Sequence, residues 1–504
     1  MHLAQEPLVQ MYRKVDATPI PAEKFQFPLS AQLDQDNRWV LMAKLIPWEQ
    51  FEEEYAQNFS KEMGAPAKSF RMALGALIIK EKLGITDRET VEKIKENPYL
   101  QYFIGLSAYR NQVPFDSSML VHFRSRINLD LVNKINQEMV KNIRKGISDE
   151  SEIKKSEEEE SNKKNRGRLI LDATCAPADI SYPNDLGILN QARQQTEKII
   201  DSLYKYQSGK LKKKPRTYRN QARKAYLEVA KRRRPSRKKR RKAIRKQLQY
   251  IKRNLGYISE LIKTGVSLSS LNKIKYKMLL VVGEVYRQQL WMYKNKKQRI
   301  EDRIVSLSQP HIRPIVRGKA GKAVEFGAKL SASCIDGYVF LDKISWNNFN
   351  ESGDLKTQVE AFKEYTGVYP ESVHVDRIYR TRENRAWCKE KGIRMSGPPL
   401  GRPPASISKE KKKQANNDER IRNAIEGKFG QAKRRFSLNR IMAKLRNTSE
   451  TAIAITFLVI NLSALLRQFF CVYFCQKYFF ISFSLSPIIV GLISEKQSLY
   501  KFIA

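Results

Sequence analysis

The chain has 504 residues, of which 41% are hydrophobic and 29% charged, a composition typical of a globular protein with several domains and not of a disordered one. Its 94 Lys and Arg against 52 Asp and Glu leave a net charge of +42, which points to a polyanionic partner, either nucleic acid or an anionic membrane surface. Five scattered cysteines and four histidines show no zinc-ligand spacing, so a structural zinc site and a disulfide framework are not expected.

The N-terminal part is predicted to be an arm followed by helices. Residues 1–45 carry several prolines and little periodicity, and the first residues contain no apolar signal-peptide segment. From residue 46 the apolar residues recur at helical spacing, and Gly84 is a suitable end for the first clear helix. The residues that mark its apolar face are Phe70, Leu74, Leu77 and Ile78.

Two further helices are predicted before residue 147. Thr86 and Glu89 have the spacing of a capping box, and Pro98 closes the helix that they open. Residues 116–118 precede another apolar-periodic stretch, beside which Arg124 and Arg126 are expected to be exposed and to contact DNA. Short helices with tight connections predict an all-α, helix-turn-helix-like DNA-binding domain over residues 46–147, although many small helical bundles bind no DNA.

A charged low-complexity stretch separates this domain from the next segment. Residues 148–166 read SDESEIKKSEEEESNKKNR and are predicted to be a flexible linker. Immediately after it, the apolar run 169–171 ends in Asp172. This pattern predicts a short buried strand with a carboxylate at its end.

Residues from about 190 to 305 form a basic helical insertion. Between Leu203 and Asn254 there are 23 Lys or Arg and a single acid, Glu228, with tyrosines interleaved. Because nearly all of its charges are positive, this stretch is not expected to pack against itself. One interpretation is therefore an insert that is exposed to solvent. Basic residues mixed with aromatic ones also suit phosphate neutralisation and base stacking, which favours contact with nucleic acid. The cations expected to make that contact are Arg232, Arg233, Arg234, Lys238, Lys239, Arg240 and Arg241.

The remaining pattern is that of a mixed α/β core. Strand-like runs at Glu325–Ser333 and Tyr338–Ser345 are joined by Asp336-Gly337, a strong hairpin signal. A short strand at Ser372–Val375 leads into Asp376, and helices are predicted at about 418–436 and at Thr451–Leu466, the latter buried. Residues 467–504 form an apolar tail, for which a core or oligomer contact is favoured over a membrane span. The order predicts an α/β domain over residues 167–466 with a large insertion.

Asp172, Asp376 and Glu426 are the candidate catalytic residues. Transfer of a phosphoryl group requires charge neutralisation and alignment, which two Mg²⁺ ions roughly 3.5–4 Å apart can supply when carboxylates from rigid elements hold them. Taken singly, each Asp is equally well a turn residue, and Arg422–Glu426 is equally well a surface ion pair. However, Arg422, Glu426 and Lys433 fall on one helical stripe roughly 40° wide, which brings two cations and an acid towards one partner.

Four passages carry a resemblance to a known family. The N-terminal ones are LGITDRETVEKIKENPYLQYFIGL and VPFDSSMLVHFRSRI, and the later ones are LILDATCAPADISYP and VHVDRIYRTRENRAWCKEKGIR. The last is followed by R-x₃-E-x₆-K at Arg422, Glu426 and Lys433. In this order they resemble the DDE transposases of bacterial insertion sequences with an InsH-type N-terminal domain, over about residues 40–465.

The resemblance implies a ribonuclease H-like catalytic fold with two bound Mg²⁺ or Mn²⁺ ions. Asp172, Asp376 and Glu426 would be the first, second and third metal-binding acids, and Arg422 and Lys433 would match the family's DNA-contacting cations. The family's signature has Tyr where this chain has Glu419, so the end-strand contact of that Tyr is not carried over. Trp387 is a candidate for stacking on an extruded base, with core packing as the alternative.

The expected function is therefore DNA transposition in the bacterial cytoplasm, at the nucleoid. The enzyme would bind terminal inverted repeats and target DNA as a homodimer or higher oligomer, cleave a strand and transfer its 3′-hydroxyl, without a small-molecule substrate. Three alternatives remain: a metal-dependent nuclease of the same fold, a non-enzymatic nucleic-acid-binding protein, and a membrane-associated basic protein.

Overall fold

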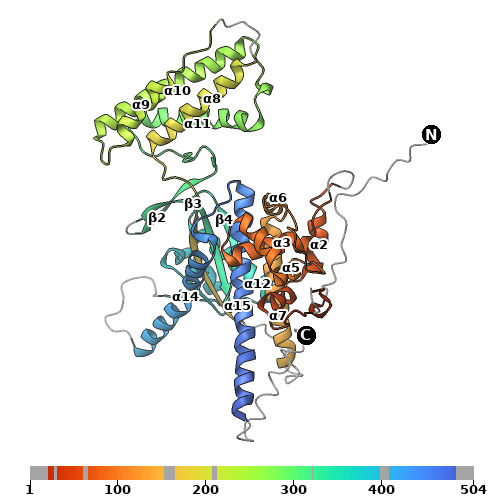
Figure 1. Cartoon of the computed structure of the whole chain (residues 1–504). Helices are drawn as coiled ribbons and strands as arrows, with labels where there is room; N and C mark the ends of the chain where they lie inside the picture. Colours follow the sequence, from red (N-terminus) through yellow and green to blue (C-terminus); the bar gives the residue numbers. More distant parts are fainter. Residues whose placement is uncertain are drawn as a thin grey trace, which may run out of the picture. The chain divides into compact units, whose positions relative to one another are not determined.

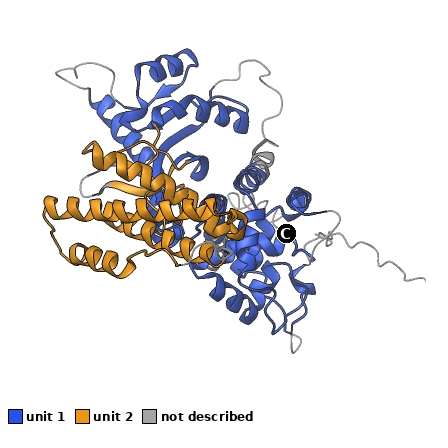
Figure 2. Cartoon of the chain, turned by 90° about the horizontal axis from the view of Figure 1, so that it is seen from above, with its two compact units in different colours: residues 1–176, 330–344, 350–504 blue, residues 177–329, 345–349 orange. Residues whose placement is uncertain are grey.

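The computed structural model describes residues 21–27, 31–60, 66–152, 165–206, 213–319, 322–397 and 408–483. The chain divides into two compact units, coloured separately in Figure 2. Unit 1 comprises residues 1–176, 330–344 and 350–504, and unit 2 comprises residues 177–329 and 345–349. The N-terminal helices and the acids predicted to be catalytic thus belong to one compact unit, and the basic insertion forms most of the other.

The N-terminal half of unit 1 is helical, as predicted. Gly84 ends α3 in the left-handed region at φ 67°, and both hydrogen bonds of the Thr86–Glu89 capping box open α4. The expected arm over residues 1–45 contains α1, most of which is buried, and α7 extends into the predicted linker, whose residues 153–164 lie outside the described part of the chain. The helices are α1 Arg38–Leu45, α2 Trp48–Ala56, α3 Phe70–Leu83, α4 Asp87–Glu96, α5 Pro98–Phe103, α6 Met119–Arg126 and α7 Leu129–Glu152.

Helix α15 (Arg446–Phe483) unites the N-terminal helices with the rest of unit 1. It packs against α1, α3, α6 and α7, and Figure 1 shows it running beside α7. The Oγ1 atom of Thr456 donates to Oε1 of Glu81 at 2.6 Å, and Nδ2 of Asn461 donates to Oδ1 of Asn136 at 2.9 Å. The N-terminal helices therefore share a core with the C-terminal helix, which the domain boundaries expected from the sequence did not anticipate.

The buried helix predicted at Thr451–Leu466 is confirmed as part of α15. Within the described residues, α15 is long and apolar enough over Arg446–Cys471 to cross a membrane, with a mean hydropathy of 1.8. However, 78% of the most apolar stretch of this helix is buried inside the protein, as is usual for the core helix of a soluble fold. The helix continues to Phe483 into the predicted apolar tail, and residues 484–504 lie outside the described part.

A six-stranded sheet forms the centre of the α/β part. The strands have the order β2-β3-β1-β5-β6, with β4 paired to β3; β1, β5 and β6 are parallel, and β2 and β3 antiparallel. The predicted hairpin turn is confirmed, since Asp336 and Gly337 both have positive φ (50° and 84°), as a two-residue turn between twisted strands requires. The strands are β1 Arg168–Pro177, β2 Arg313–Lys319, β3 Lys322–Ile335, β4 Tyr338–Ser345, β5 Ser372–Val375 and β6 Arg394–Met395.

Three helices of unit 1 follow the hairpin in the chain: α12 Leu355–Thr366, α13 Arg382–Glu390 and α14 Lys409–Arg435. Helix α14 is the one predicted at about 418–436, and it begins nearer the N-terminus than the sequence indicated. Most of the Gly/Pro-rich stretch before it, residues 398–407, lies outside the described part.

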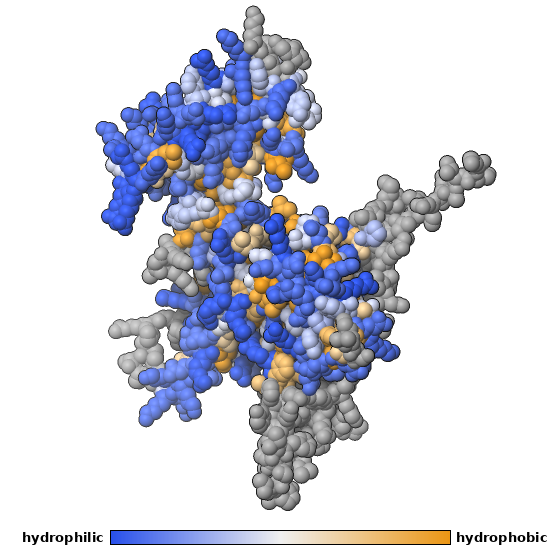
Figure 3. Space-filling view, in the orientation of Figure 1, coloured by the Kyte–Doolittle hydropathy of each residue, from blue (hydrophilic) through white to orange (hydrophobic). Residues whose placement is uncertain are grey.

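Unit 2 is built mainly from the basic insertion, which folds into packed helices. The expectation that its charge would prevent self-packing is wrong, because α10 is amphipathic: Ile251, Ile258 and Leu261 are buried while the cations lie outside. Figure 3 shows hydrophilic side chains over much of these helices. They are α8 Asp185–Tyr204, α9 Arg219–Ala230, α10 Arg237–Lys263 and α11 Lys273–Lys294.

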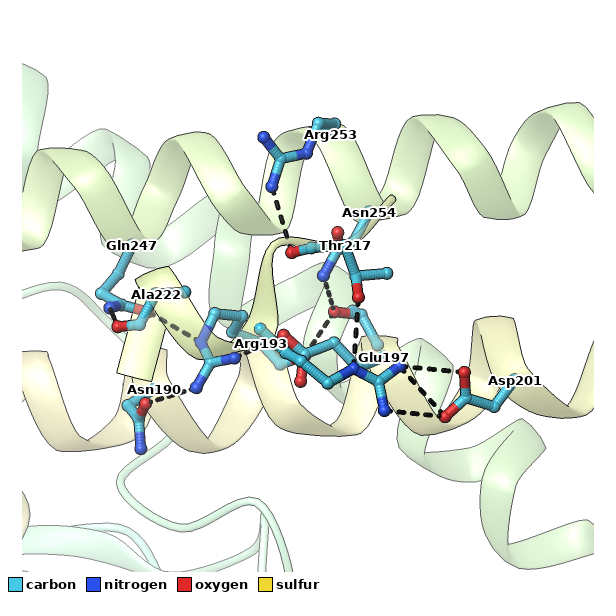
Figure 4. Close-up of polar contacts among 11 residues, drawn as sticks. Asn190, Arg193, Glu197, Asp201, Thr217, Ala222, Gln247, Arg253 and Asn254 are labelled. Atoms are coloured by element: carbon cyan, nitrogen blue, oxygen red, sulfur yellow. Dashed lines mark hydrogen bonds and ion pairs between the residues drawn. The ribbon is translucent and has the colours of Figure 1, made fainter. Parts of the chain in front are cut away.

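A buried polar network joins three of these helices (Figure 4). Arg193 on α8 is 1% exposed; its guanidinium pairs with Glu197 and donates to Oδ1 of Asn190 at 2.8 Å and to Oε1 of Gln247 at 3.2 Å. The amide of Gln247, on α10, in turn donates to the Ala222 carbonyl of α9 at 3.1 Å. Because Arg193 and Glu197 are both buried, their mutual pairing compensates for much of the desolvation of each charge.

Candidate active site

Asp172 and Asp376 occupy matching positions relative to two neighbouring parallel strands. The register of β1 and β5 pairs Leu171 with Val375. Asp172 is the next residue within β1, which continues to Pro177 instead of ending at this carboxylate as predicted, and Asp376 is the first residue after β5. Successive side chains alternate between the faces of a sheet, so Asp172 lies on the same face as Ile170, whose register partner is His374. Neighbouring strands lie about 4.8 Å apart. The pairing therefore brings together two acids that are far apart in the sequence.

Helix α14 packs against β5 and is held on the face that carries His374. Asp418 on α14 is buried; its carboxylate accepts hydrogen bonds from Nη1 and Nη2 of Arg394 at 2.8 and 2.9 Å, and its Oδ1 lies 3.6 Å from Nδ1 of His374. Burial lowers the pKa of His374. Glu426 follows Asp418 by two helical turns, which is about 12 Å along the axis.

Glu426 is paired with Arg422 on its own helix. Nη1 of Arg422 lies 2.8 Å from Oε1 of Glu426, and Nη2 lies 2.6 Å from Oε1 of Glu419. The side chain of Arg422 is 16% exposed and that of Glu426 is 53% exposed. The hydrogen bonds to Glu419 and Glu426 raise the pKa of Arg422. The guanidinium is therefore paired with two acids, one of them at the position where the resemblance places a Tyr.

Asp172 lies within electrostatic reach of α14. Burial raises the pKa of Asp172 to about 6, and the charges of Glu351 and Glu426 contribute in the same direction. The N–H of Ala173, which donates to Oδ1 of Asp172 at 2.8 Å, and the charge of Arg422 act in the opposite direction. Asp172, Glu426 and Arg422 thus influence one another across the site.

Glu351 is an acid near this site that the sequence did not indicate. It lies in the 3₁₀ helix η4 (Glu351–Asp354), which packs against η5 (Arg377–Tyr379), directly after Asp376. The side-chain amide of Asn384 joins the two, because Nδ2 donates to the carbonyls of Ser352 and Tyr379 at 2.8 and 2.9 Å. No apolar run precedes Glu351, so the pattern that identified Asp172 and Asp376 is missing.

Arg380 adds a cation beside the end of β5. Its Nη2 donates to the carbonyl of Val375 at 2.7 Å, and burial lowers its pKa while the nearby Asp376 raises it. A Cβ atom on Gly397 would lie 2.0 Å from Nη1 of Arg380, and Gly397 has φ +101°. Glycine is therefore required at this position of the Gly/Pro-rich stretch for the guanidinium to occupy its place.

The acids are not gathered tightly enough to form a complete metal site. Among the described residues, no three Asp, Glu, His or Cys side chains are close enough to hold one metal ion. The structure thus places Asp172 and Asp376 one position beyond the register pair Leu171–Val375, with Glu426 in electrostatic reach of Asp172 but bonded to Arg422.

Two family models match the chain. Residues 27–126 match a family described as a transposase domain, and residues 373–463 match one described as a transposase DDE domain. Together the two matches support an insertion-sequence DDE transposase. The DDE match includes Asp376, Arg422, Glu426 and Lys433, whereas Asp172 and the basic insertion fall between the two matched regions.

One curated relative of this transposase is an uncharacterized protein, ORF8 in the nfe locus, from Rhizobium meliloti. The two are 26% identical over 171 residues, which is 34% of the transposase and 76% of the relative. No solved structure matches the transposase at a significant level.

The expected exposure of two cations in the N-terminal part of the transposase, Arg124 and Arg126, is corrected. Arg124 is 8% exposed and pairs with both carboxylate oxygens of Asp87, at 2.6 and 3.1 Å, and Arg126 is half-buried with its guanidinium 4.4 Å from the centre of the Phe59 ring. Neither side chain is exposed as expected, because α6 turns this side towards neighbouring helices. The reading of Arg124 as a cation on an open face is therefore wrong.

The other residues predicted to contact DNA are exposed or half-buried. Arg241 is half-buried, stacks on the Tyr293 ring at 4.2 Å and donates to the Tyr293 carbonyl at 3.0 Å. Trp387 on α13 and Lys433 on α14 are half-buried. The exposed ones are Arg232, Arg233, Arg234, Lys238, Lys239 and Arg240.

Proposed function

We propose that this transposase cuts DNA at the terminal inverted repeats of its element and joins the exposed 3′-hydroxyl to target DNA. The observation that carries the proposal is the placement of Asp172 in β1 and of Asp376 directly after the neighbouring parallel strand β5, against which the helix that carries Glu426 and Arg422 packs. Strand ends and a docked helix hold charged groups more rigidly than loops do. In this proposal the six-stranded sheet and the helices packed on it form a ribonuclease H-like core, and Asp172, Asp376 and Glu426 are its catalytic acids.

The residues present suit divalent metal ions. Carboxylate oxygens are the ligands that Mg²⁺ and Mn²⁺ prefer. The negative charges of Glu351 and Glu426 help to raise the pKa of Asp172, and a bound cation would relieve this repulsion. Asp172, Asp376 and Glu426 would hold the two ions, which supply charge neutralisation for phosphoryl transfer when bound. If Glu426 held a metal ion, Arg422 would keep its ion pair with Glu419, and the Nη1 atom that now meets Glu426 would be open to a DNA phosphate.

The basic residues serve in DNA binding. Lys433, two turns after Glu426 on α14, and Trp387 on α13 would contact the transposon end, and the exposed cations at residues 232–234 and 238–240 would bind its backbone. The helices over residues 46–147 would recognise the inverted repeats, and a dimer or larger assembly would hold two ends together. We assign the protein to the bacterial cytoplasm, where its DNA substrate lies.

The test is strand cleavage and strand transfer by the Asp376→Asn variant, on DNA carrying the element's inverted repeats. We expect the variant to bind this DNA as the unaltered protein does and to form no cleaved or joined product in Mg²⁺ or Mn²⁺. Asp130→Asn, on the exposed first turn of α7, is the matched control and should keep both activities. Cleavage that survives Asp376→Asn would overturn the assignment, and cleavage without joined products would favour a nuclease of the same fold.

A further inference from the structure

A basic hollow in unit 2 lies where the beginning of α10 meets the end of α11. Its volume is about 570 Å³, and its lining includes seven Lys or Arg against one carboxylate, Asp185. The exposed cations among them are Arg237, Arg240, Lys296, Lys297 and Arg299. So dense a positive charge around one concave surface raises the local concentration of anions.

Two of the seven cations have hydrogen-bonding or ion-pair partners in the fold, and a third, Lys297, lies over the Trp291 ring at 5.7 Å. Arg303 pairs with Asp185 at 2.6 Å and donates to the Gln298 carbonyl at 2.8 Å, while Arg241 is held by Tyr293. The single carboxylate of the hollow is therefore already neutralised.

The exposed cations are available to a ligand. Within the described residues, Arg237, Arg240 and Arg299 have no ion pair with a carboxylate. Their guanidinium groups are planar donors that fit phosphate oxygens bidentately. A phosphodiester backbone would therefore neutralise the positive charge that the fold leaves unpaired here.

An aromatic ring stands at the edge of the same hollow. Tyr182 is 79% exposed, a high value for a tyrosine, and its ring meets that of Phe326 edge to face, with centroids 5.7 Å apart. This exposure leaves at least one face of the Tyr182 ring open. An open aromatic face beside a row of cations is the arrangement by which proteins bind unpaired bases.

We infer that this hollow binds a DNA strand at a point where a base is unpaired, with phosphates on Arg240, Arg299 and their neighbours and the base stacked on Tyr182. A base stacked inside a duplex has no free face for Tyr182, so a transposon end with an unpaired stretch should bind better than a blunt duplex, which exposes only the outer face of its terminal pair. The inference rests on the proposed DNA function but involves none of the three catalytic acids, so the two can fail separately.

The experiment measures binding of the full-length protein to fluorescent oligonucleotides in EDTA, where cleavage is not needed. One probe is a blunt duplex and the other is the same duplex with a single-stranded tail. Arg240→Ala/Arg299→Ala is compared with Lys252→Ala/Lys263→Ala, which removes the same charge from exposed positions further along α10. Tyr182→Ala is compared with Tyr206→Ala, another tyrosine with a highly exposed side chain.

We expect Arg240→Ala/Arg299→Ala to weaken binding of the tailed duplex about 10-fold and to reduce the slope of log K against log salt by about 1.4, as loss of two single-strand phosphate contacts predicts. Tyr182→Ala should weaken binding of the tailed duplex about 10-fold and leave the blunt duplex unchanged, whereas Tyr182→Phe should bind as the unaltered protein. The control variants should change either affinity less than about 3-fold.

Three outcomes overturn the inference. Equal losses for the two charge-removing pairs would show that net charge alone matters, and equal effects of Tyr182→Ala on both probes would exclude stacking on an unpaired base. Loss of sedimentation with anionic lipid vesicles, instead of loss of DNA binding, would assign the hollow to a membrane surface. Asp376→Asn reports separately on the catalytic proposal, because it should bind the tailed duplex fully even though it cannot cut.

Discussion

The Nη1 atom of Arg422 lies 2.8 Å from Oε1 of Glu426, so the third acid of the candidate site has a cationic partner of its own. The same guanidinium reaches Glu419 at 2.6 Å. Glu419 and Glu426 therefore compete for Arg422. The stronger the bond between Arg422 and Glu426, the lower the affinity of Glu426 for a metal ion.

The first prediction concerns this competition. Glu419→Ala should weaken Mn²⁺ binding about 2- to 5-fold, because Arg422 then bonds to Glu426 alone, and Arg422→Gln should strengthen it by a similar factor. Isothermal titration of the DNA-free protein with Mn²⁺ measures both effects. If Glu419→Ala and Arg422→Gln change the affinity in the same direction, the two acids do not compete for Arg422.

The second prediction concerns the pKa of Asp172, which is about 6 against an ordinary 3.8. A carboxyl whose pKa is raised on folding contributes stability below its unfolded pKa, and this contribution is lost as the pH rises through the folded pKa. Asp172→Asn keeps the group neutral at every pH. In EDTA at pH 7.5 it should therefore raise the free energy of unfolding by about 3 kcal/mol, with no gain near pH 3.5.

Urea unfolding across this pH range measures the effect. Asp130→Asn, on the exposed start of α7, is the control and should change stability by less than about 0.5 kcal/mol at any pH. A destabilised Asp172→Asn protein at pH 7.5 would mean that the ionised carboxylate is well solvated or paired, against the burial described above.

The third prediction concerns Glu351. Its negative charge helps to raise the pKa of Asp172, so Glu351→Gln should lower that pKa below about 6. Metal ions bind the ionised carboxylate, and the pH at which Mn²⁺ affinity falls to half should therefore move to a lower value. Glu364→Gln, exposed on α12, should leave the midpoint in place. An unchanged midpoint in Glu351→Gln would place Glu351 outside the site.

The fourth prediction concerns the buried pair Arg193–Glu197 in unit 2. Arg193→Ala leaves the carboxylate of Glu197 buried without its partner and should destabilise unit 2 by about 3–5 kcal/mol. Arg193→Met/Glu197→Met should cost less, because no charge is left unpaired. Amide hydrogen exchange of α8 and α10 reports on this unit specifically. Arg219→Ala, which breaks the partly exposed pair with Asp201, should cost less than about 1 kcal/mol.

Elements defined by neighbouring residues could be predicted from the sequence. The strand Ser372–Val375, the turn at Asp336-Gly337 and the capping box at Thr86 were found where the pattern placed them. Each depends on side chains and dihedral angles within a few positions along the chain. The family could be recognised for a related reason, since its motifs are short and contiguous.

The tertiary structure decided what depends on residues far apart in the chain. The register that sets Asp172 beside Asp376 joins two distant segments, and Arg124 is buried because Asp87, 37 residues earlier, faces it. Glu351 entered the site only through the packing of η4 against η5. Asp172, Asp376 and Glu426 could therefore be named from the sequence. Their pairing, burial and partners could not, because Coulomb interactions and desolvation depend on distances that only the folded chain sets.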